Sequence, residues 1–87
     1  MENLNKLKEL EYLNLALNNI SIIENIEGCE SLRKLDMTVN FVDVMDLKDS
    51  VTCLSKLPNF KELYLTGNPC EDWKGCKDYV IANVETL

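Results

Sequence analysis

The sequence predicts an α/β solenoid of the leucine-rich-repeat class, with short parallel strands on a concave face and a helical cap at its C-terminal end. One apolar pattern ending in asparagine occurs three times: Leu10-x-x-Leu13-x-Leu15-x-x-Asn18, Leu32-x-x-Leu35-x-Met37-x-x-Asn40 and Phe60-x-x-Leu63-x-Leu65-x-x-Asn68. The copies begin 22 and 28 residues apart, inside the roughly 20–29-residue period of this repeat. The segment after the third copy does not repeat, as expected for a terminal cap.

These copies divide one domain, residues 1–87, into a partial repeat 1–9, repeats 10–31, 32–59 and 60–70, and a cap 71–87. Leu4 and Leu7 resemble the tail of a repeat whose strand is missing. Such an uncapped N-terminal edge is expected to expose apolar residues and unpaired backbone groups. We expect a fragment of a longer array; the alternative is a short protein that self-associates through this edge.

Alternating apolar residues within each copy predict strands. A period of two, as in Leu13-x-Leu15, Leu35-x-Met37 and Leu63-x-Leu65, indicates a strand with one buried face. Because a return segment separates successive strands, the three strands are expected to form one parallel ladder.

The two return segments predict different convex structures. Ile20, Ile23 and Ile26 recur every third residue, which fits a tight 3₁₀-like or short helical path. The longer second segment has the apolar spacing of an amphipathic helix over about 46–57, with Asp46 and Asp49 near its start. Pro58 is expected to end this helix, because the residue before proline avoids helical backbone angles.

The cap is expected to be a closing helix over residues 71–84. Spacings of three, four and four residues place Trp73, Cys76, Val80 and Val84 on one helical face. That face is expected to cover the edge of the last strand.

The three asparagines, Asn18, Asn40 and Asn68, are interpreted as a structural ladder. A buried amide carries donors and an acceptor, so it can bond the turn of its own repeat and that of its neighbour. Buried polar groups are tolerated when they are paired in this way.

The strand residues between the buried leucines predict a partner-binding surface on the concave face. In register they form rows of Tyr12, Lys34 and Glu62, then Asn14, Asp36 and Tyr64, then Ala16, Thr38 and Thr66, with Leu17, Val39 and Gly67 at the lip. An exposed Lys34–Glu62 ion pair contributes little to stability. Tyrosine, however, is enriched among the residues that anchor protein interfaces.

Composition favours a protein-binding domain over other classes. With 15 acids and 9 bases the net charge is −6, which opposes attraction to phosphate backbones, so no nucleic-acid partner is expected. No segment approaches the roughly 20 apolar residues of a membrane span, and no membrane partner is expected. Without histidine, glycine-rich loop or calcium-loop spacing, the sequence predicts no catalytic residue, no metal and no cofactor.

The four cysteines, Cys29, Cys53, Cys70 and Cys76, show no C-x-x-C spacing. We expect reduced thiols that act mostly as small buried apolar groups. A Cys70–Cys76 disulfide is the one alternative to four reduced thiols.

Three strings carry a resemblance to a known family: "LEYLNLALNNI" over 10–20, "KLDMTVNF" over 34–41 and "GNPC" over 67–70. Together with the repeats they closely resemble the N-terminal repeat domain of the tilB (seahorse) ciliary proteins, the dynein axonemal assembly factor 11 family. The resemblance covers nearly the whole chain and is weakest over 43–57.

The resemblance implies a non-enzymatic scaffold or adaptor that preassembles axonemal dynein arms in the cytoplasm for motile cilia or flagella, with dynein assembly factors or chaperones as partners. It also implies further repeats before this segment, and a cap continuation, a coiled coil and a co-chaperone-like domain after it. Two rivals share the repeat type: the regulatory subunits of a protein phosphatase, and the spliceosomal A′ subunit. The three strings favour the ciliary family over both.

Overall fold

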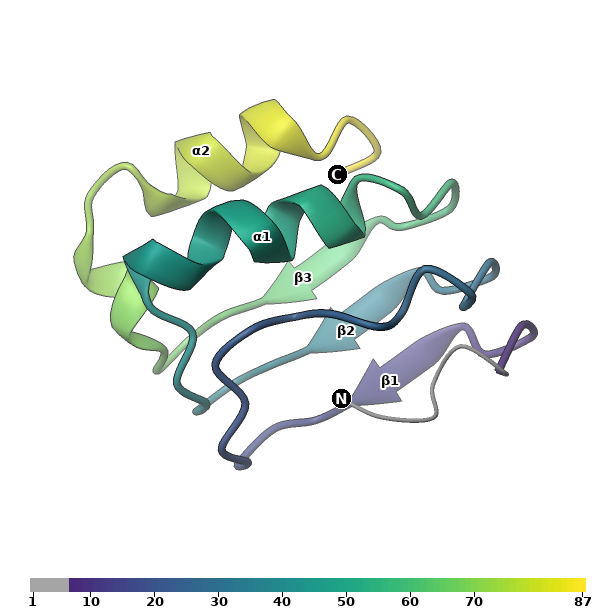
Figure 1. Ribbon diagram of the computed structural model, residues 1–87, viewed down its shortest axis with the longest axis horizontal. Helices are drawn as coiled ribbons and strands as arrows, with labels where there is room; N and C mark the ends of the chain where they lie inside the picture. Colours follow the sequence, from purple (N-terminus) through teal and green to yellow (C-terminus); the bar gives the residue numbers. More distant parts are fainter. Residues whose placement is uncertain (1–6) are drawn as a thin grey trace.

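The computed structural model describes residues 7–87, so most of the predicted partial repeat 1–9, including Leu4, lies outside the described residues. The elements in chain order are β1 (Tyr12–Asn14), β2 (Lys34–Asp36), α1 (Val44–Leu54), β3 (Glu62–Tyr64), the 3₁₀ helix η1 (Pro69–Asp72) and α2 (Cys76–Asn83). The three strands form one parallel sheet in the order β1-β2-β3 (Figure 1). Each strand lies within one residue of its predicted position.

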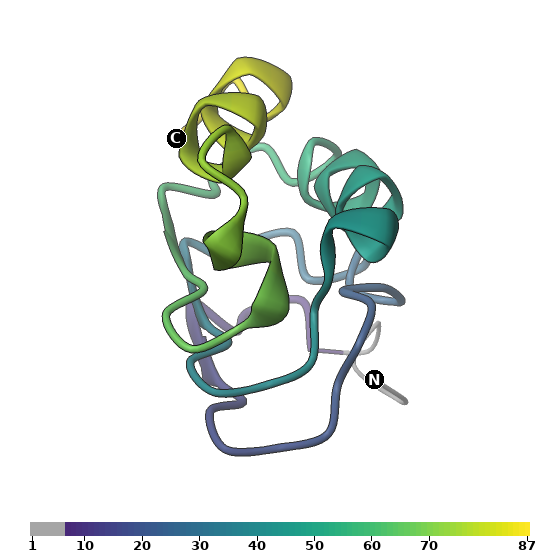
Figure 2. The ribbon, with the colours of Figure 1, turned by 90° about the vertical axis from the view of Figure 1, so that its left-hand side faces the viewer.

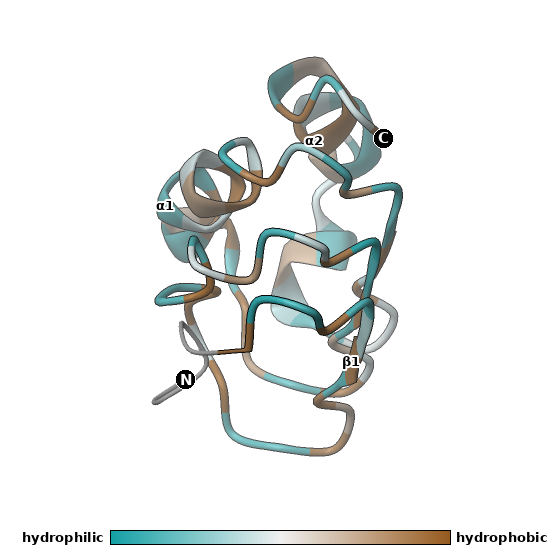
Figure 3. Cartoon of the chain, turned by 90° about the vertical axis from the view of Figure 1, so that its right-hand side faces the viewer, coloured by the Kyte–Doolittle hydropathy of each residue, from teal (hydrophilic) through white to brown (hydrophobic). Residues whose placement is uncertain are grey.

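The sheet and the return segments form two layers. The strands lie on one side and α1 with the first return segment on the other, while α2 closes the end beyond β3 (Figures 1 and 2). Inward-facing residues of both layers meet between them, including Leu32, Leu35, Met37, Leu54 and Phe60, all fully buried. Figure 3 shows hydrophobic and hydrophilic residues interspersed along the chain in both layers.

The core thins toward β1. Leu13 and Leu15 are only partly buried, whereas the equivalent Leu35 and Met37 of the central strand are fully buried. The reason is position, because β1 has a strand neighbour on one side among the described residues.

Two of the three asparagines tie successive turns together. The Asn40 amide donates to the carbonyls of Leu15 (2.9 Å) and Met37 (3.0 Å), and its oxygen accepts from the Ile20 N–H at 3.1 Å. Asn68 repeats this one turn later, donating to Met37 (2.8 Å) and Leu65 (3.0 Å) and accepting from Val42 (3.0 Å). Each amide therefore completes the turn that precedes its own.

Asn18 differs from the expectation of a buried ladder member. It is exposed, and it donates to the carbonyls of Leu15 (2.8 Å) and Ala16 (3.1 Å) in its own turn. The physical reason is that no earlier turn lies beside β1 within residues 7–87.

Helix α1 begins and ends earlier than the predicted 46–57. Asp43 caps it by accepting from the Val44 N–H at 2.7 Å, and Asp46 lies in its first turn, where negative charge complements the helix dipole. After Leu54 the chain tightens into three-residue turns, from Lys56 to Cys53 and from Leu57 to Leu54, because Pro58 cannot continue the helix.

The first return segment corrects a prediction, since it is neither α- nor 3₁₀-helical. Of the three isoleucines predicted at a period of three, Ile23 and Ile26 are buried and Ile20 is partly buried, and Cys29 is a further buried residue at this spacing. Asn25, however, has φ 59°, and this left-handed backbone interrupts any helix. The buried Ser50 hydroxyl of α1 accepts from the Ile23 N–H at 3.0 Å and so fixes the segment to the helix.

The cap also differs from the predicted continuous helix over 71–84. It contains two helices, η1 and α2, because Trp73 between them is extended (φ −83°, ψ 122°). The half-exposed Trp73 ring packs over Gly75, where an added Cβ would lie 2.6 Å from the ring, and against Tyr79 with centroids 5.8 Å apart. Cys76 and Val80 are buried on α2, and Val84 is buried directly after the helix ends, but Trp73 lies before α2 begins.

All four cysteines are buried, as predicted, and none of the four forms a disulfide bond within residues 7–87. Loss of hydration raises the pKa of Cys53 to about 11 and that of Cys70 to about 12, where the neighbouring Cys76 thiol adds to the effect. The thiolate form is therefore rare at neutral pH.

Within residues 7–87, the helices lack the length and the apolar content that a membrane-spanning helix requires.

The ladder predicts unequal costs for two alanine substitutions. Asn68→Ala should lower the free energy of unfolding by about 2 kcal/mol or more, because it leaves the buried Val42 N–H without its acceptor. Asn18→Ala should cost less than about 1 kcal/mol, because Asn18 is exposed and bonds only its own turn. Urea denaturation of both variants measures the difference; equal costs would contradict the bridging role of Asn68.

The raised thiol pKa values predict slow alkylation. At pH 8 the folded protein should react with iodoacetamide at Cys53 and Cys70 roughly tenfold or more slowly than the same protein in concentrated urea, because burial suppresses the reactive thiolate. Peptide mass mapping after timed quenching measures each rate. Native alkylation of Cys70 at the denatured rate would contradict its burial.

Candidate protein-binding face

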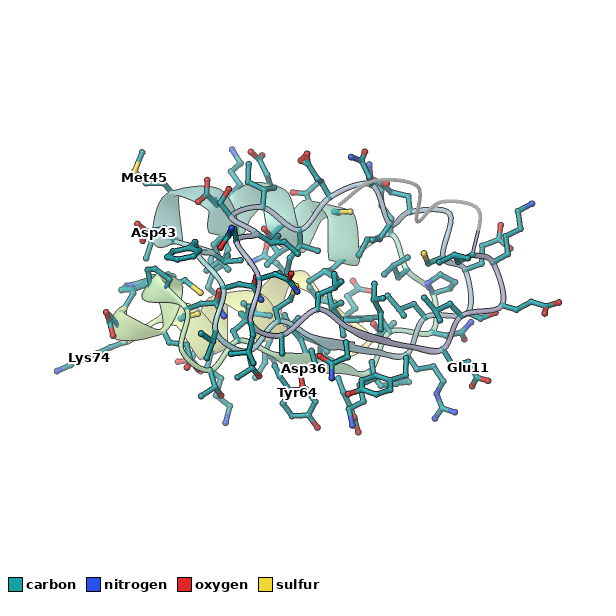
Figure 4. The ribbon with its side chains drawn as sticks, turned by 90° about the horizontal axis from the view of Figure 1, so that it is seen from below. Glu11, Asp36, Asp43, Met45, Tyr64 and Lys74 are labelled. Atoms are coloured by element: carbon teal, nitrogen blue, oxygen red, sulfur yellow. The ribbon has the colours of Figure 1, made fainter. Side chains whose placement is uncertain are left out.

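Six predicted residues share one surface, which we call the open sheet face: Tyr12, Asn14, Lys34, Asp36, Glu62 and Tyr64. In each strand the middle residue turns toward the core and its two neighbours turn outward, as the two-residue period of a strand requires. In Figure 4, Asp36 and Tyr64 lie on the side of the molecule opposite Met45, which belongs to α1.

Strand pairing sets these residues in two rows. Tyr12, Lys34 and Glu62 occupy matching positions in the three strands, and so do Asn14, Asp36 and Tyr64. The rows expected from the sequence are thus confirmed by the register. The structural asparagines, in contrast, lie where the chain leaves the strands and are not part of this face.

Lys34 is the centre of the face. Its ammonium lies 4.8 Å from the Tyr12 ring centroid and 5.3 Å from that of Tyr64, and 3.8 Å from a Glu62 carboxylate oxygen. The Tyr64 hydroxyl donates to the same carboxylate at 3.4 Å. The attraction between the ammonium and the two aromatic faces is a modest stabilising interaction, and so is the partly exposed ion pair. Together these contacts hold both rings on the surface.

Asp36 is held by the next outward residue of its own chain. It accepts from the Thr38 hydroxyl at 2.5 Å and from the Thr38 N–H at 2.9 Å. These bonds, the hydroxyl first, hold the pKa of the Asp36 carboxyl below its usual value. Asn14 does the same one strand earlier and accepts from the Ala16 N–H at 3.0 Å.

The open sheet face borders a hollow at the edge of β3. A space of about 450 Å³ lies between β3 and α2, with Glu62, Tyr64, Val80 and Ile81 among its lining residues. A partner that covers the Tyr64 ring therefore meets a recess with both apolar and charged lining residues beside it.

Sequence reasoning missed two groups of residues. Glu11 and Arg33 form an exposed ion pair 3.8 Å apart where the strands begin, and their positions directly before two registered strand residues were the available signal. Phe41 and Met45 are exposed apolar residues at the other end of the strands, and no sequence period distinguished them from core residues.

Curated proteins match the chain along its whole length. The protein named dynein axonemal assembly factor 11 in Mus musculus is 53% identical over 87 residues, and its namesake in Danio rerio is 58% identical over 87 residues. The Drosophila melanogaster protein named tilB is 53% identical over the same length. The chain spans 18%, 19% and 21% of these proteins, about a fifth of their length. No protein-family model matches the chain.

These matches confirm the resemblance recognised in the three sequence strings. The names of these relatives lend no support to the phosphatase alternative.

The Asp36–Thr38 contact predicts a change in titration. Thr38→Val should raise the pKa of the Asp36 carboxyl toward its usual value, because the hydroxyl bond that favours the charged form is removed. Thr66→Val, at the matching position beside Tyr64, is the control and should leave Asp36 unchanged. Carboxyl ¹³C chemical shifts followed against pH measure both variants; an unchanged Asp36 titration in Thr38→Val would contradict the assignment.

Proposed function

Because the chain is, along its whole length, a homologue of one segment of the dynein axonemal assembly factor 11 proteins, we propose that it is a scaffold segment for assembling axonemal dynein arms. The supporting observation is identity of 53–58% over all 87 residues to relatives from a mammal, a fish and an insect. The names of the mammalian and fish proteins specify this process.

We propose that the segment takes part in this assembly in the cytoplasm, before the dynein arms enter motile cilia or flagella. On this proposal the segment has no catalytic role and binds other proteins, with dynein assembly factors or chaperones as the partner class. Retention of 53–58% identity with proteins named for assembly supports this role.

The proposed architecture is a stretch of leucine-rich-repeat solenoid. Three features support it: parallel strands in sequence order, matching register in neighbouring pairs, and amides of Asn40 and Asn68 that bridge successive turns. Such an array presents its strand residues as one extended surface.

The proposed binding surface is the open sheet face. Tyr12 and Tyr64 are 47% and 41% exposed, yet Lys34 holds both rings in place through the contacts described above. Pre-ordered aromatic side chains lose little freedom on binding, which favours their use as anchors. The hollow beside Tyr64 adds a recess at the same place, with Val80 and Ile81 among its apolar lining residues.

Substitution of both tyrosines tests the proposed surface. Tyr12→Ala with Tyr64→Ala should reduce recovery of dynein assembly factors from the cytosol of ciliated cells at least about tenfold, as loss of two interface anchors predicts. The matched control is Asp49→Ala with Lys56→Ala on or next to α1, where both residues are exposed and the net charge is conserved. Quantitative mass spectrometry of the captured proteins measures recovery.

Equal recovery by the tyrosine variant and the native protein would show that the open sheet face is not the binding surface. The cellular role has a separate test, since it requires an organism that builds motile cilia or flagella. An organism without either would overturn the role in dynein assembly, whichever face binds.

A further inference from the structure

A second surface lies where the chain leaves the strands, and we call it the strand-end face. It comprises the apolar residues Leu17, Val39, Phe41 and Met45 and the acids Asp43, Glu71 and Asp72. These residues belong to the three turns, the start of α1 and η1, which face the viewer in Figure 2. In Figure 4, Asp43 and Met45 lie at the same end of the molecule.

Two of the apolar side chains stand on unfavourable backbone. Leu17 has φ 61° and Val39 has φ 55°, in the left-handed region, which is an outlier for a β-branched residue. The third turn has Gly67 with φ 80° at the matching position, and glycine adopts this conformation without strain. The turn can therefore be built without a side chain, and two of the three turns carry one nevertheless.

Burial does not account for these side chains. Leu17 is 77% exposed and Val39 is 47% exposed, with the Val39 methyl lying beside Gly67. Phe41 and Met45, two and six residues after Val39, are exposed as well, at 58% and 88%. Contiguous exposed apolar side chains mark interaction sites in soluble proteins.

The backbone of this face is already paired. The N–H groups of Leu17, Val39 and Phe41 bond the carbonyls of Thr38, Thr66 and Ile20, and those of Ile20 and Val42 bond the asparagine amides. These five N–H groups are therefore not available to an extended peptide. Recognition through side chains, which an α-helix presents on its surface, needs none of them.

The charged residues within the turns of this face are acids, and Lys74 is a base at the same end of the molecule (Figure 4). The turns 17–20, 39–43 and 67–73 contain Asp43, Glu71 and Asp72 and no lysine or arginine. Asp46 follows in the first turn of α1, and Lys74 is the first base after η1. Phe41, Gly67, Glu71 and Asp72 line one hollow of about 360 Å³, so the apolar and acidic groups border the same space.

We propose that the strand-end face binds a basic amphipathic helix of a partner protein. The apolar side of that helix packs on Leu17, Val39, Phe41 and Met45, and its lysine or arginine side chains meet Asp43, Glu71 and Asp72. Complementary charge of this kind speeds association and selects against acidic partners. This surface is distinct from the open sheet face, and the two proposals stand or fall separately.

The test uses two 18-residue helical peptides that differ in charge alone, one of leucine and lysine and one of leucine and glutamate with the same apolar face. Titration of the ¹⁵N-labelled protein measures both affinities and locates the contact. The lysine peptide should bind at least about tenfold more tightly than the glutamate peptide, shift the amides of turns 17–20, 39–43 and 67–73, and weaken with added salt.

The decisive variant is Leu17→Asn with Val39→Asn, since asparagine tolerates left-handed backbone. It should stay as stable toward urea as the native protein and bind the lysine peptide at least about tenfold more weakly. The matched control is Tyr12→Ala with Tyr64→Ala on the open sheet face, which should bind it like the native protein.

Four results would overturn the proposal: no binding of the lysine peptide, equal binding of both peptides, amide shifts confined to other surfaces, or unchanged affinity in the asparagine variant. Sedimentation of the native protein over a concentration range tests whether a second copy of the chain occupies the strand-end face. A dimer that disappears in the asparagine variant would assign the face to a second copy of the chain instead.

Discussion

The buried amides of Asn40 and Asn68 are the constraint on which the rest of the structure depends. Wherever the chain leaves a strand, its N–H and C=O groups lose their ladder partners, and burying them unpaired is costly. After β1 and after β2, one amide satisfies two carbonyls and one N–H. The strands can therefore be only three residues long and still stack in register, and this register creates the rows of the open sheet face.

The strand positions and the two rows could be predicted because their causes are local. Alternation within Leu35-x-Met37 specifies which side is buried, and the recurring asparagine sets where each copy aligns with the next. The helix of the second return segment was predictable from apolar spacing, although Asp43 as its cap was not identified. The expected ion pair between Lys34 and Glu62 followed from the register alone.

The features that could not be predicted depend on contacts between residues that are far apart in the sequence. Period three in the first return segment suggested a helix, but Ser50 of α1 and the left-handed Asn25 hold that segment in turns. Helical spacing in the cap suggested one continuous element, but Trp73 packs on Gly75 and Tyr79 and breaks it in two. Neither the tyrosine–lysine contacts nor the exposed apolar residues Phe41 and Met45 have a periodic signature. They became visible only when the turns were placed side by side.

The asparagine bridges all point the same way along the chain. Asn40 completes the turn that contains Ile20, and Asn68 completes the turn that contains Val42. The backbone bonds between the same turns run both ways, since the Leu17 N–H donates to the later Thr38 carbonyl and the Phe41 N–H donates to the earlier Ile20 carbonyl. The N–H groups of Ile20 and Val42, however, find their acceptor in asparagines that follow 20 and 26 residues later. In a chain made from its N-terminus, each of these two turns therefore gains that bond only after the next copy of the pattern has been made.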